Sequence, residues 1–152
     1  MILVLHNIRS VHNVGSIFRT ADAGGVSRII LSGYTPTPLD RFNNPRKDFA
    51  KVSLGAEKTV PWVQKKSLPL AIKHLRDEGC VIAAVEQDKH SIPLFDYKPP
   101  KKLALVLGNE VRGLSKQSLN LCDVIVEIPM RGKKESLNVS VAAGVAVFAL
   151  NQ

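Results

Sequence analysis

The chain has 152 residues, enough for one domain whose apolar core needs no disulfide bonds or metals to hold it together. Hydrophobic residues make up 45% of it, which argues against a disordered polypeptide. Its 21 Lys and Arg against 13 Asp and Glu give a net charge of +8, which favours a polyanionic partner, RNA or DNA before a membrane. Each basic cluster by itself is most simply a solvated surface, and only their sum indicates a nucleic acid.

The cysteines and the chain ends bear on the cellular compartment. Cys80 and Cys122 are far apart and show neither metal-ligand nor redox spacing, so we expect reduced, buried thiols and no metal site. The apolar run at the start is too short for a signal peptide, and the one at the end is too short to span a bilayer. We therefore expect a cytoplasmic protein in which residues 1–152 form a single domain.

Apolar runs of strand length alternate with helix-like stretches along the chain. They cover residues 2–5, 28–32, 80–86, 103–108 and 123–129. The runs are nearly continuous rather than alternating, which is typical of strands covered on both faces. This pattern predicts an α/β fold, a mostly parallel sheet with helices on both faces. Ligands of such sheets bind beyond the carboxyl ends of the strands, so the residues after each run are the first site candidates.

Behind the first strand, residues 14–23 predict a helix that ends at Gly24-Gly25. We expect Asn13 to cap this helix and Arg19 to project from its second turn. An arginine near a helix N-terminus adds to a positive field that suits phosphate. A capped helix with a solvated arginine explains the same residues, so this stretch alone does not indicate a site.

The region from Tyr34 to Trp62 is rich in proline and basic residues and is the least regular part of the chain. It is either a substrate-facing insertion or, slightly favoured, a long surface loop with a short helix inside it. A further helix with one apolar stripe is predicted after it, with Ser67 as N-cap and Gly79 as the stop.

The strand over 103–108 ends in glycine, and an amide and a carboxylate follow it. Gly108 and Gly113 have the spacing of a phosphate-binding loop, but Leu114 stands where that loop requires lysine. No G-x-G-x-x-G follows any predicted strand, which counts against a Rossmann dinucleotide site. A tight turn with a solvated Glu110 explains the segment, and so does a ligand that lies flat against Gly108.

The last stretch, residues 137–150, has apolar residues around its whole circumference. This predicts a helix that is buried on all sides, including against a second copy of the chain. Ser136 is expected to be its N-cap. That role leaves Asn138 and Ser140 unexplained, because burying an unpaired polar group costs roughly 1–3 kcal/mol.

Three spaced motifs resemble the SpoU/TrmH family of SPOUT RNA methyltransferases over nearly the whole chain. The motifs are Asn13-x-Gly15-x-x-x-Arg19-Thr20-Ala21, Leu107-Gly108-Asn109-Glu110-x-x-Gly113-Leu114, and Ile128-Pro129-Met130 followed by Ser136-Leu137-Asn138-Val139-Ser140. The resemblance implies an α/β fold with a deep carboxyl-terminal trefoil knot, which nothing in the hydrophobic periodicity predicts, and an obligate homodimer. It also implies S-adenosylmethionine as cofactor and methyl transfer to a ribose 2′-hydroxyl of RNA, with tRNA favoured over rRNA.

The resemblance assigns roles by position. The implied cofactor-binding residues are Ala84, Gly108, Ile128, Ser136 and Leu137, and the implied catalytic residues are Arg19, Asn13, Glu110, Ser136 and Asn138. Because a guanidinium is always charged, we expect Arg19 to grip a phosphate and stabilise the emerging alkoxide rather than act as the base. We expect no separate RNA-binding extension, so that basic loops such as 41–51 and 131–134 capture the RNA.

Two other functions remain open at this level. One is an RNA-binding module of the same fold that has lost catalysis. The presence of Arg19, Glu110, Ser136 and Asn138 argues against it. The other is a nucleotide-binding protein of an ordinary doubly wound fold, which the missing phosphate loops disfavour.

Overall fold

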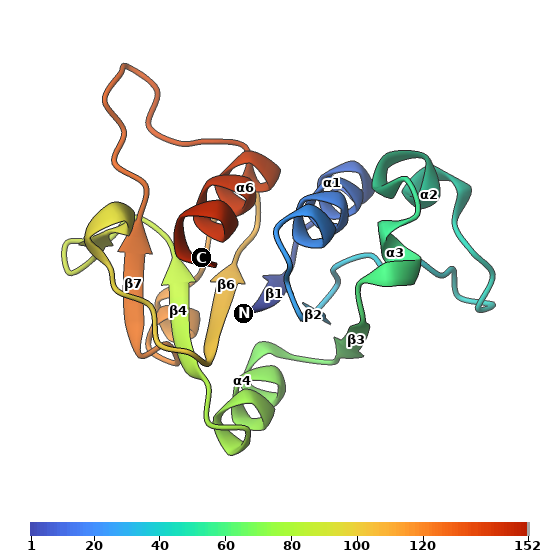
Figure 1. Ribbon diagram of the computed structural model, residues 1–152, viewed down its shortest axis with the longest axis horizontal. Coiled ribbons are helices and arrows are strands. Elements are labelled where there is room, and N and C mark those ends of the chain that lie inside the picture. The colour runs from blue at the N-terminus through green and yellow to red at the C-terminus, as the bar shows by residue number, and fades with distance from the viewer. Residues whose placement is uncertain (152) are drawn as a thin grey trace.

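A parallel sheet of seven strands forms the middle layer of the protein (Figure 1). The computed structural model describes residues 1–151. The strand order is β3-β2-β1-β6-β4-β7-β5, and neighbouring strands pair in parallel throughout. The strands are β1 (Ile2–His6), β2 (Arg28–Ser32), β3 (Trp62–Lys65), β4 (Val81–Val85), β5 (Ile92–Pro93), β6 (Leu103–Leu107) and β7 (Val124–Glu127).

The predicted α/β fold with a parallel sheet is confirmed, and all five predicted strands are present. The sequence analysis did not predict β3 and β5. These two strands lie at the edges of the sheet and are only partly covered, so they lack the continuous apolar run of a buried strand. Strand β6, in contrast, is buried along its whole length.

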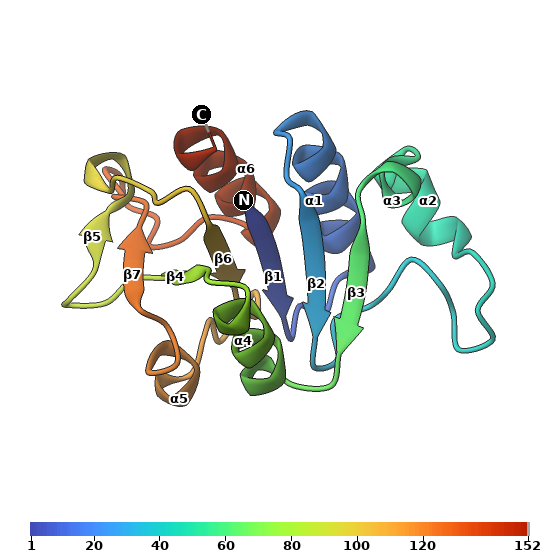
Figure 2. The ribbon, with the colours of Figure 1, turned by 60° about the horizontal axis from the view of Figure 1, so that its bottom comes forward.

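Helices cover both faces of the sheet (Figure 2). They are α1 (Val11–Ala23), α2 (Lys47–Ser53), α3 (Ala56–Thr59), α4 (Leu68–Asp77), α5 (Lys116–Leu119) and α6 (Val139–Leu150), with a 3-10 turn η1 (Leu94–Asp96). Helices α1, α2, α3 and α6 lie on one face, and α4 and α5 lie on the other. Helix α6 packs beside α1, although the two are at opposite ends of the sequence (Figure 1).

Helix α1 begins one turn earlier than the sequence analysis predicts. Ser10 is its N-cap, and the Ser10 hydroxyl oxygen accepts a hydrogen bond from the backbone N–H of Asn13 at 3.2 Å. The prediction of Asn13 as N-cap is therefore wrong, because Ser10 offers an equally good acceptor three residues upstream. Arg19 consequently lies in the third turn of a 13-residue helix, beyond the reach of the positive helix end.

Helix α6 begins two residues later than predicted. Asn138 is its N-cap, and its side-chain oxygen accepts hydrogen bonds from the Ser140 backbone N–H at 2.9 Å and the Ser140 hydroxyl at 2.6 Å. The prediction of Ser136 as N-cap is wrong, since an asparagine caps a helix as well as a serine does. Ser136 and Leu137 therefore lie in the connection that leads from β7 to the helix.

The irregular region after β2 is more ordered than the favoured prediction of a long surface loop with one short helix inside it. It contains α2 and α3, and the buried ring of Phe49 packs edge-on against Phe18 of α1, with ring centroids 5.2 Å apart. The longest connection in this region is the segment 33–46, in which an isolated antiparallel bridge joins Leu39 to Pro45.

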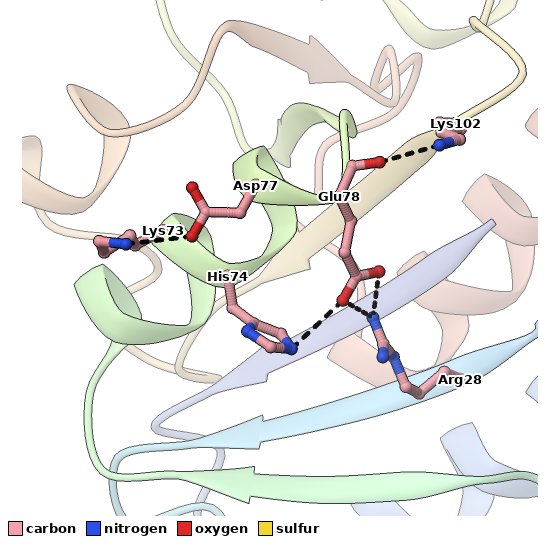
Figure 3. Close-up of polar contacts among 6 residues, drawn as sticks. All are labelled: Arg28, Lys73, His74, Asp77, Glu78 and Lys102. Atoms are coloured by element: carbon pink, nitrogen blue, oxygen red, sulfur yellow. Dashed lines mark hydrogen bonds and ion pairs between the residues drawn. The ribbon is translucent and has the colours of Figure 1, made fainter.

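A polar network joins the end of α4 to residues at the amino ends of the strands (Figure 3). The Glu78 carboxylate accepts hydrogen bonds from the Arg28 guanidinium at 2.8 and 2.9 Å, and His74 lies 3.3 Å from it. Lys102 donates to the Glu78 carbonyl at 2.9 Å. No helix within residues 1–151 has both the length and the apolar character needed to cross a membrane.

Candidate active site

A cavity of about 190 Å³ opens at the carboxyl ends of β4, β6 and β7. Ligands of parallel sheets bind at this edge. Its lining residues come from the ends of these strands and from the start of α6: Val85, Glu86, Gln87, Leu107, Gly108, Asn109, Glu110, Val111, Gly113, Ile128, Met130, Ser136, Leu137, Val139 and Ala142. Three segments that are far apart in the sequence thus enclose one space.

The cavity combines apolar walls with negative charge. Both charged side chains in its lining are carboxylates, Glu86 and Glu110, and the described lining residues include neither lysine nor arginine. Such a lining suits a ligand with an apolar or aromatic part and a positive charge, and it disfavours phosphate groups. This charge distribution argues against the nucleotide-binding alternative.

Gly108 allows the loop after β6 to fold back on itself. A Cβ atom at this position would lie 2.8 Å from the carbonyl carbon of Gly113 and 2.8 Å from Cγ of Leu114. The side chain of Asn109 stabilises the same turn, because its oxygen accepts from the backbone N–H groups of Val111 at 3.0 Å and Arg112 at 2.9 Å. The glycine is therefore required by the loop itself, before any ligand is considered.

Two residues after β4 shape the cavity, and the sequence analysis gave them no role. The Glu86 carboxylate accepts a hydrogen bond from the Leu114 backbone N–H at 3.0 Å, and the Gln87 amide donates to the Glu135 carbonyl at 2.5 Å. They tie the end of β4 to the loop after β6 and to the segment before α6. Because they directly follow a predicted buried strand, Glu86 and Gln87 were among the first site candidates of the sequence, without a specific role.

Glu110 forms one end of a hydrogen-bonded chain of predicted catalytic residues, with Asn13 in the middle. Its carboxylate accepts from the backbone N–H groups of Arg9 and Ser10 and from the side-chain amide of Asn13, each at 3.0 Å. The Asn13 side-chain oxygen in turn accepts from the Asn138 amide at 3.2 Å. Segments after β1, after β6 and before α6 are thereby joined at the rim of the cavity.

These hydrogen bonds decide the charge of Glu110. Partial burial opposes ionisation, but the hydrogen bonds from Arg9, Ser10 and Asn13 outweigh it and hold the pKa of the Glu110 carboxyl below its ordinary value of 4.5. Glu110 is therefore ionised at neutral pH and weakly basic. It is suited to orienting Asn13 and anchoring the start of α1, not to removing a proton from a substrate.

Replacing Glu110 by glutamine should make the stability of the fold depend less on pH in the acid range. Because the pKa is lowered in the folded state, Glu110 stabilises the fold above its unfolded pKa, and this contribution disappears as the pH falls through the folded pKa. The unfolding midpoints of the parent and of Glu110→Gln should therefore differ most near neutral pH and converge as the pH falls through the lowered pKa of the folded state. Thermal unfolding as a function of pH measures the difference, with the exposed Glu135→Gln as control. A constant difference down to pH 3 would contradict this assignment.

The structure separates Arg19 from the other predicted catalytic residues. Its exposed side chain lines a different hollow, between α1 and α2, together with His12 and Lys51. Within the described part of the chain, Arg19 takes part in no ion pair. The Glu110–Asn13–Asn138 chain and Arg19 thus belong to different surfaces of one protomer.

The predicted cofactor-binding residues are mostly at the cavity. Gly108, Ile128, Ser136 and Leu137 line it. Ala84 is fully buried inside β4 and is not in the lining, whereas its neighbour Val85 is.

Thiol and metal chemistry find no support among the described residues. Burial raises the pKa of both free thiols, that of Cys122 to about 11. Residues 1–151 contain no group of three or more His, Cys, Asp or Glu side chains that could hold a metal ion.

Comparison with known proteins finds relatives over nearly the whole chain. The model of the SpoU rRNA Methylase family matches residues 1–148. A curated relative, 23S rRNA (guanosine-2'-O-)-methyltransferase RlmB of Ralstonia nicotianae, is 37% identical over 97% of this chain and 57% of its own length. The chain thus spans little more than half the length of this relative.

Two solved structures share the fold over nearly the whole chain. The AdoMet-bound rRNA methyltransferase of Sinorhizobium meliloti has a TM-score of 0.87 at 28% identity, covering 97% of this chain and 54% of that one. A structure described as giving insights into the 2-OH methylation of C/U34 on tRNA has a TM-score of 0.82 at 26% identity, covering 97% of this chain and 91% of its own.

Proposed function

Since the chain belongs to the SpoU rRNA methylase family, we propose that it transfers a methyl group from S-adenosylmethionine to a ribose 2′-hydroxyl of RNA. The observation that carries the proposal is the cavity at the carboxyl ends of β4, β6 and β7, with its apolar walls and its two carboxylates. The hydrogen-bonded chain of Glu110, Asn13 and Asn138 borders this cavity.

The cavity residues fit S-adenosylmethionine by their chemistry. Apolar side chains such as Ile128, Leu137 and Val139 would cover the adenine ring, and the charges of Glu86 and Glu110 favour a sulfonium cation over a phosphate. When bound, the cofactor supplies an electrophilic methyl group. Ser136 in the lining and Asn138 beside it would contact the groups that approach from the rim.

Alignment of the ribose is the main task of the protein side chains. The hydroxyl must approach the methyl group in line, and holding it there supplies much of the rate enhancement. The amides of Asn13 and Asn138, which are linked to Glu110 by hydrogen bonds, would hold the ribose. Arg19 would bind the neighbouring phosphate and stabilise the charge that develops on the attacking oxygen.

A twofold-symmetric homodimer would bring Arg19 to such a site. Helix α6 contains only uncharged residues, and Val141 and Phe148 leave an apolar face that is more than half exposed in the protomer. The simplest partner for this face is the same face of a second protomer, packed against it. Arg19 on the adjacent α1, remote from its own cavity, would then complete the cavity of the partner.

We extend the proposal to the threading of the chain. Strand β4 lies between β6 and β7, and after β7 the chain crosses back over the sheet to place α6 beside α1 (Figure 1). This path and the similarity to SpoU methyltransferases support a deep trefoil knot in the carboxyl-terminal part.

The comparisons with known proteins bear on one property of the substrate, whether it is rRNA or tRNA. Two curated relatives of the chain are named as 23S rRNA methyltransferases, which supports rRNA more than the tRNA that the sequence analysis favoured. The structural neighbour described for tRNA keeps tRNA as the second candidate. We propose a cytoplasmic enzyme with rRNA as the preferred candidate substrate and tRNA as the second.

Two measurements test the proposal. Calorimetry should show binding of S-adenosylmethionine to the full chain, and labelled methyl groups should appear in unmodified rRNA or tRNA at a 2′-hydroxyl. Lack of cofactor binding would overturn the proposed function. If the chain binds the cofactor and RNA but transfers no methyl group to rRNA or tRNA, the alternative of a non-catalytic RNA-binding module is favoured.

A further inference from the structure

We propose that Tyr34, with Arg9 and Arg112, forms a subsite that binds a single-stranded nucleotide next to the one that is methylated. The inference rests on the proposed function and extends it to the shape of the RNA. Its basis is a second hollow that adjoins the cavity.

The two hollows share a wall. The second hollow is lined by Arg9, Tyr34, Asn109, Val111 and Arg112. Asn109 and Val111 also line the cavity. An RNA strand that presents one ribose at the rim of the cavity therefore passes the second hollow with an adjacent nucleotide.

Tyr34 offers an uncovered aromatic face there. Its side chain is 60% exposed, in a chain where aromatic residues are only 5% of the total. A nucleobase stacks on such a face whatever its identity, because every base has a π-face. Stacking on aromatic side chains is also the usual way in which proteins hold unpaired RNA bases.

The backbone that carries the ring is fixed on both sides. Gly33 has a φ of +65°, and a Cβ there would overlap the side-chain oxygen of Asn7, which accepts from the Tyr34 backbone N–H at 3.2 Å. Thr35, which is 2% exposed, donates its hydroxyl to the Leu5 carbonyl at 2.9 Å. The platform is therefore ordered before RNA binds, which lowers the entropy cost of binding.

Asn109 holds the other end of the ring. Its side-chain amide donates to the Tyr34 hydroxyl at 3.2 Å and to the Asn7 carbonyl at 3.0 Å. The loop that lines the cavity and the aromatic platform thus move as one unit. A base stacked on Tyr34 would be held at a constant distance from the cavity.

The charges divide between the two hollows. Arg9 and Arg112 are exposed beside Tyr34, and neither forms an ion pair with any residue in the range 1–151. The cavity carries carboxylates instead. The arginines therefore attract RNA phosphates to the rim, and the carboxylates repel them from the cofactor space. An RNA strand that crosses the rim requires this distribution of charge.

A third hollow continues the path beyond Tyr34. Tyr34 also borders a depression with Arg41 and Phe42, where the Arg41 guanidinium lies 4.7 Å from the centroid of the Phe42 ring and Phe42 is 68% exposed. A second ring and a further cation there suit the next nucleotides of the same strand.

The ring is tested with a fluorescein-labelled single-stranded RNA oligonucleotide of mixed sequence, by fluorescence anisotropy. Tyr34→Ala should weaken binding roughly 5- to 100-fold, the loss expected for one stacked base. Tyr34→Phe, which keeps the ring, should bind clearly tighter than Tyr34→Leu, which keeps only the bulk. Phe95→Ala removes a ring that is 67% exposed near the opposite edge of the sheet and should bind as the parent does.

The charges are tested by salt dependence. Arg112→Gln should weaken binding and reduce the slope of log affinity against log salt by about one, because one phosphate contact is lost. Lys101→Gln removes the same charge at the amino ends of the strands and should leave the slope unchanged. Duplex RNA of the same length, whose bases are paired, should bind Tyr34→Ala and the parent alike.

The outcomes separate this inference from the proposed function. Equal affinity of Tyr34→Ala and the parent for the single strand, or of Tyr34→Leu and Tyr34→Phe, overturns the subsite even if the parent binds S-adenosylmethionine and methylates RNA. Absence of cofactor binding by the parent overturns the proposed function, while the anisotropy series still decides the subsite. A cooperative thermal unfolding transition of each variant, followed by circular dichroism, shows that it has folded whether or not the cofactor binds.

Discussion

Replacing Arg19 by alanine is expected to lower methyl transfer by about 100-fold or more while cofactor affinity stays unchanged. Arg19 is absent from the lining of its own cavity, and at the partner's cavity it is proposed to contact the RNA and not the cofactor, so we expect cofactor binding to be independent of it. Its charge would act on the phosphate and on the oxygen that attacks the methyl group. Single-turnover methylation together with calorimetry measures both quantities. The exposed Lys58→Ala on α3 is the control and should keep the parent rate.

The pH profile of Arg19→Lys distinguishes the two roles of the arginine. A lysine keeps the positive charge but loses the planar guanidinium, so we expect a reduced rate that does not recover at high pH. Recovery to the parent rate at high pH, with unchanged RNA affinity, would assign Arg19 the role of base instead.

Mixed dimers test whether Arg19 serves the cavity of its partner. Arg19→Ala and Asn138→Ala should each be inactive alone. In an equal mixture of re-associated subunits, half of the dimers would carry one intact site, so about a quarter of the parent activity should return. If the mixture stays inactive although mass measurement shows mixed dimers, Arg19 acts within its own protomer.

Replacing Phe148 by glutamate is expected to convert the proposed homodimer to monomers and to abolish the proposed methyl transfer. Phe148 is 58% exposed and lies on the same side of α6 as Val141, which is 51% exposed. Burying one phenylalanine stabilises an interface by roughly 1.5–3 kcal/mol, and a twofold interface contains it twice. The dissociation constant should therefore rise by about 100-fold or more.

Sedimentation velocity at several concentrations measures this change. Phe95→Glu introduces the same charge at another exposed phenylalanine and should leave the mass unchanged. An unchanged dimer of Phe148→Glu would place the interface elsewhere. A parent that is monomeric at all concentrations would reject the homodimer.

The apolar runs of the sequence were sufficient to predict the sheet. A strand that is covered on both faces must be apolar along its whole length, so β1, β2, β4, β6 and β7 are visible without any tertiary information. Gly108 and Ile128 were identified from motifs, and both line the cavity. Helix starts were less accurate, because Ser10 competes with Asn13 and Asn138 with Ser136 for the same capping role.

Only the tertiary structure decided which of these residues meet. Strand β1 pairs with β6, so the residues that follow the two strands lie side by side, and Glu110 can bind Arg9, Ser10 and Asn13. The same arrangement leaves Arg19 on another surface. Hydrophobic periodicity describes only near neighbours in the chain, whereas strand order brings together groups about a hundred residues apart, as hydrogen bonding between Asn13 and Asn138 shows. The sequence by itself therefore determined the layers and the residue types of the site, and the order of the strands determined its geometry.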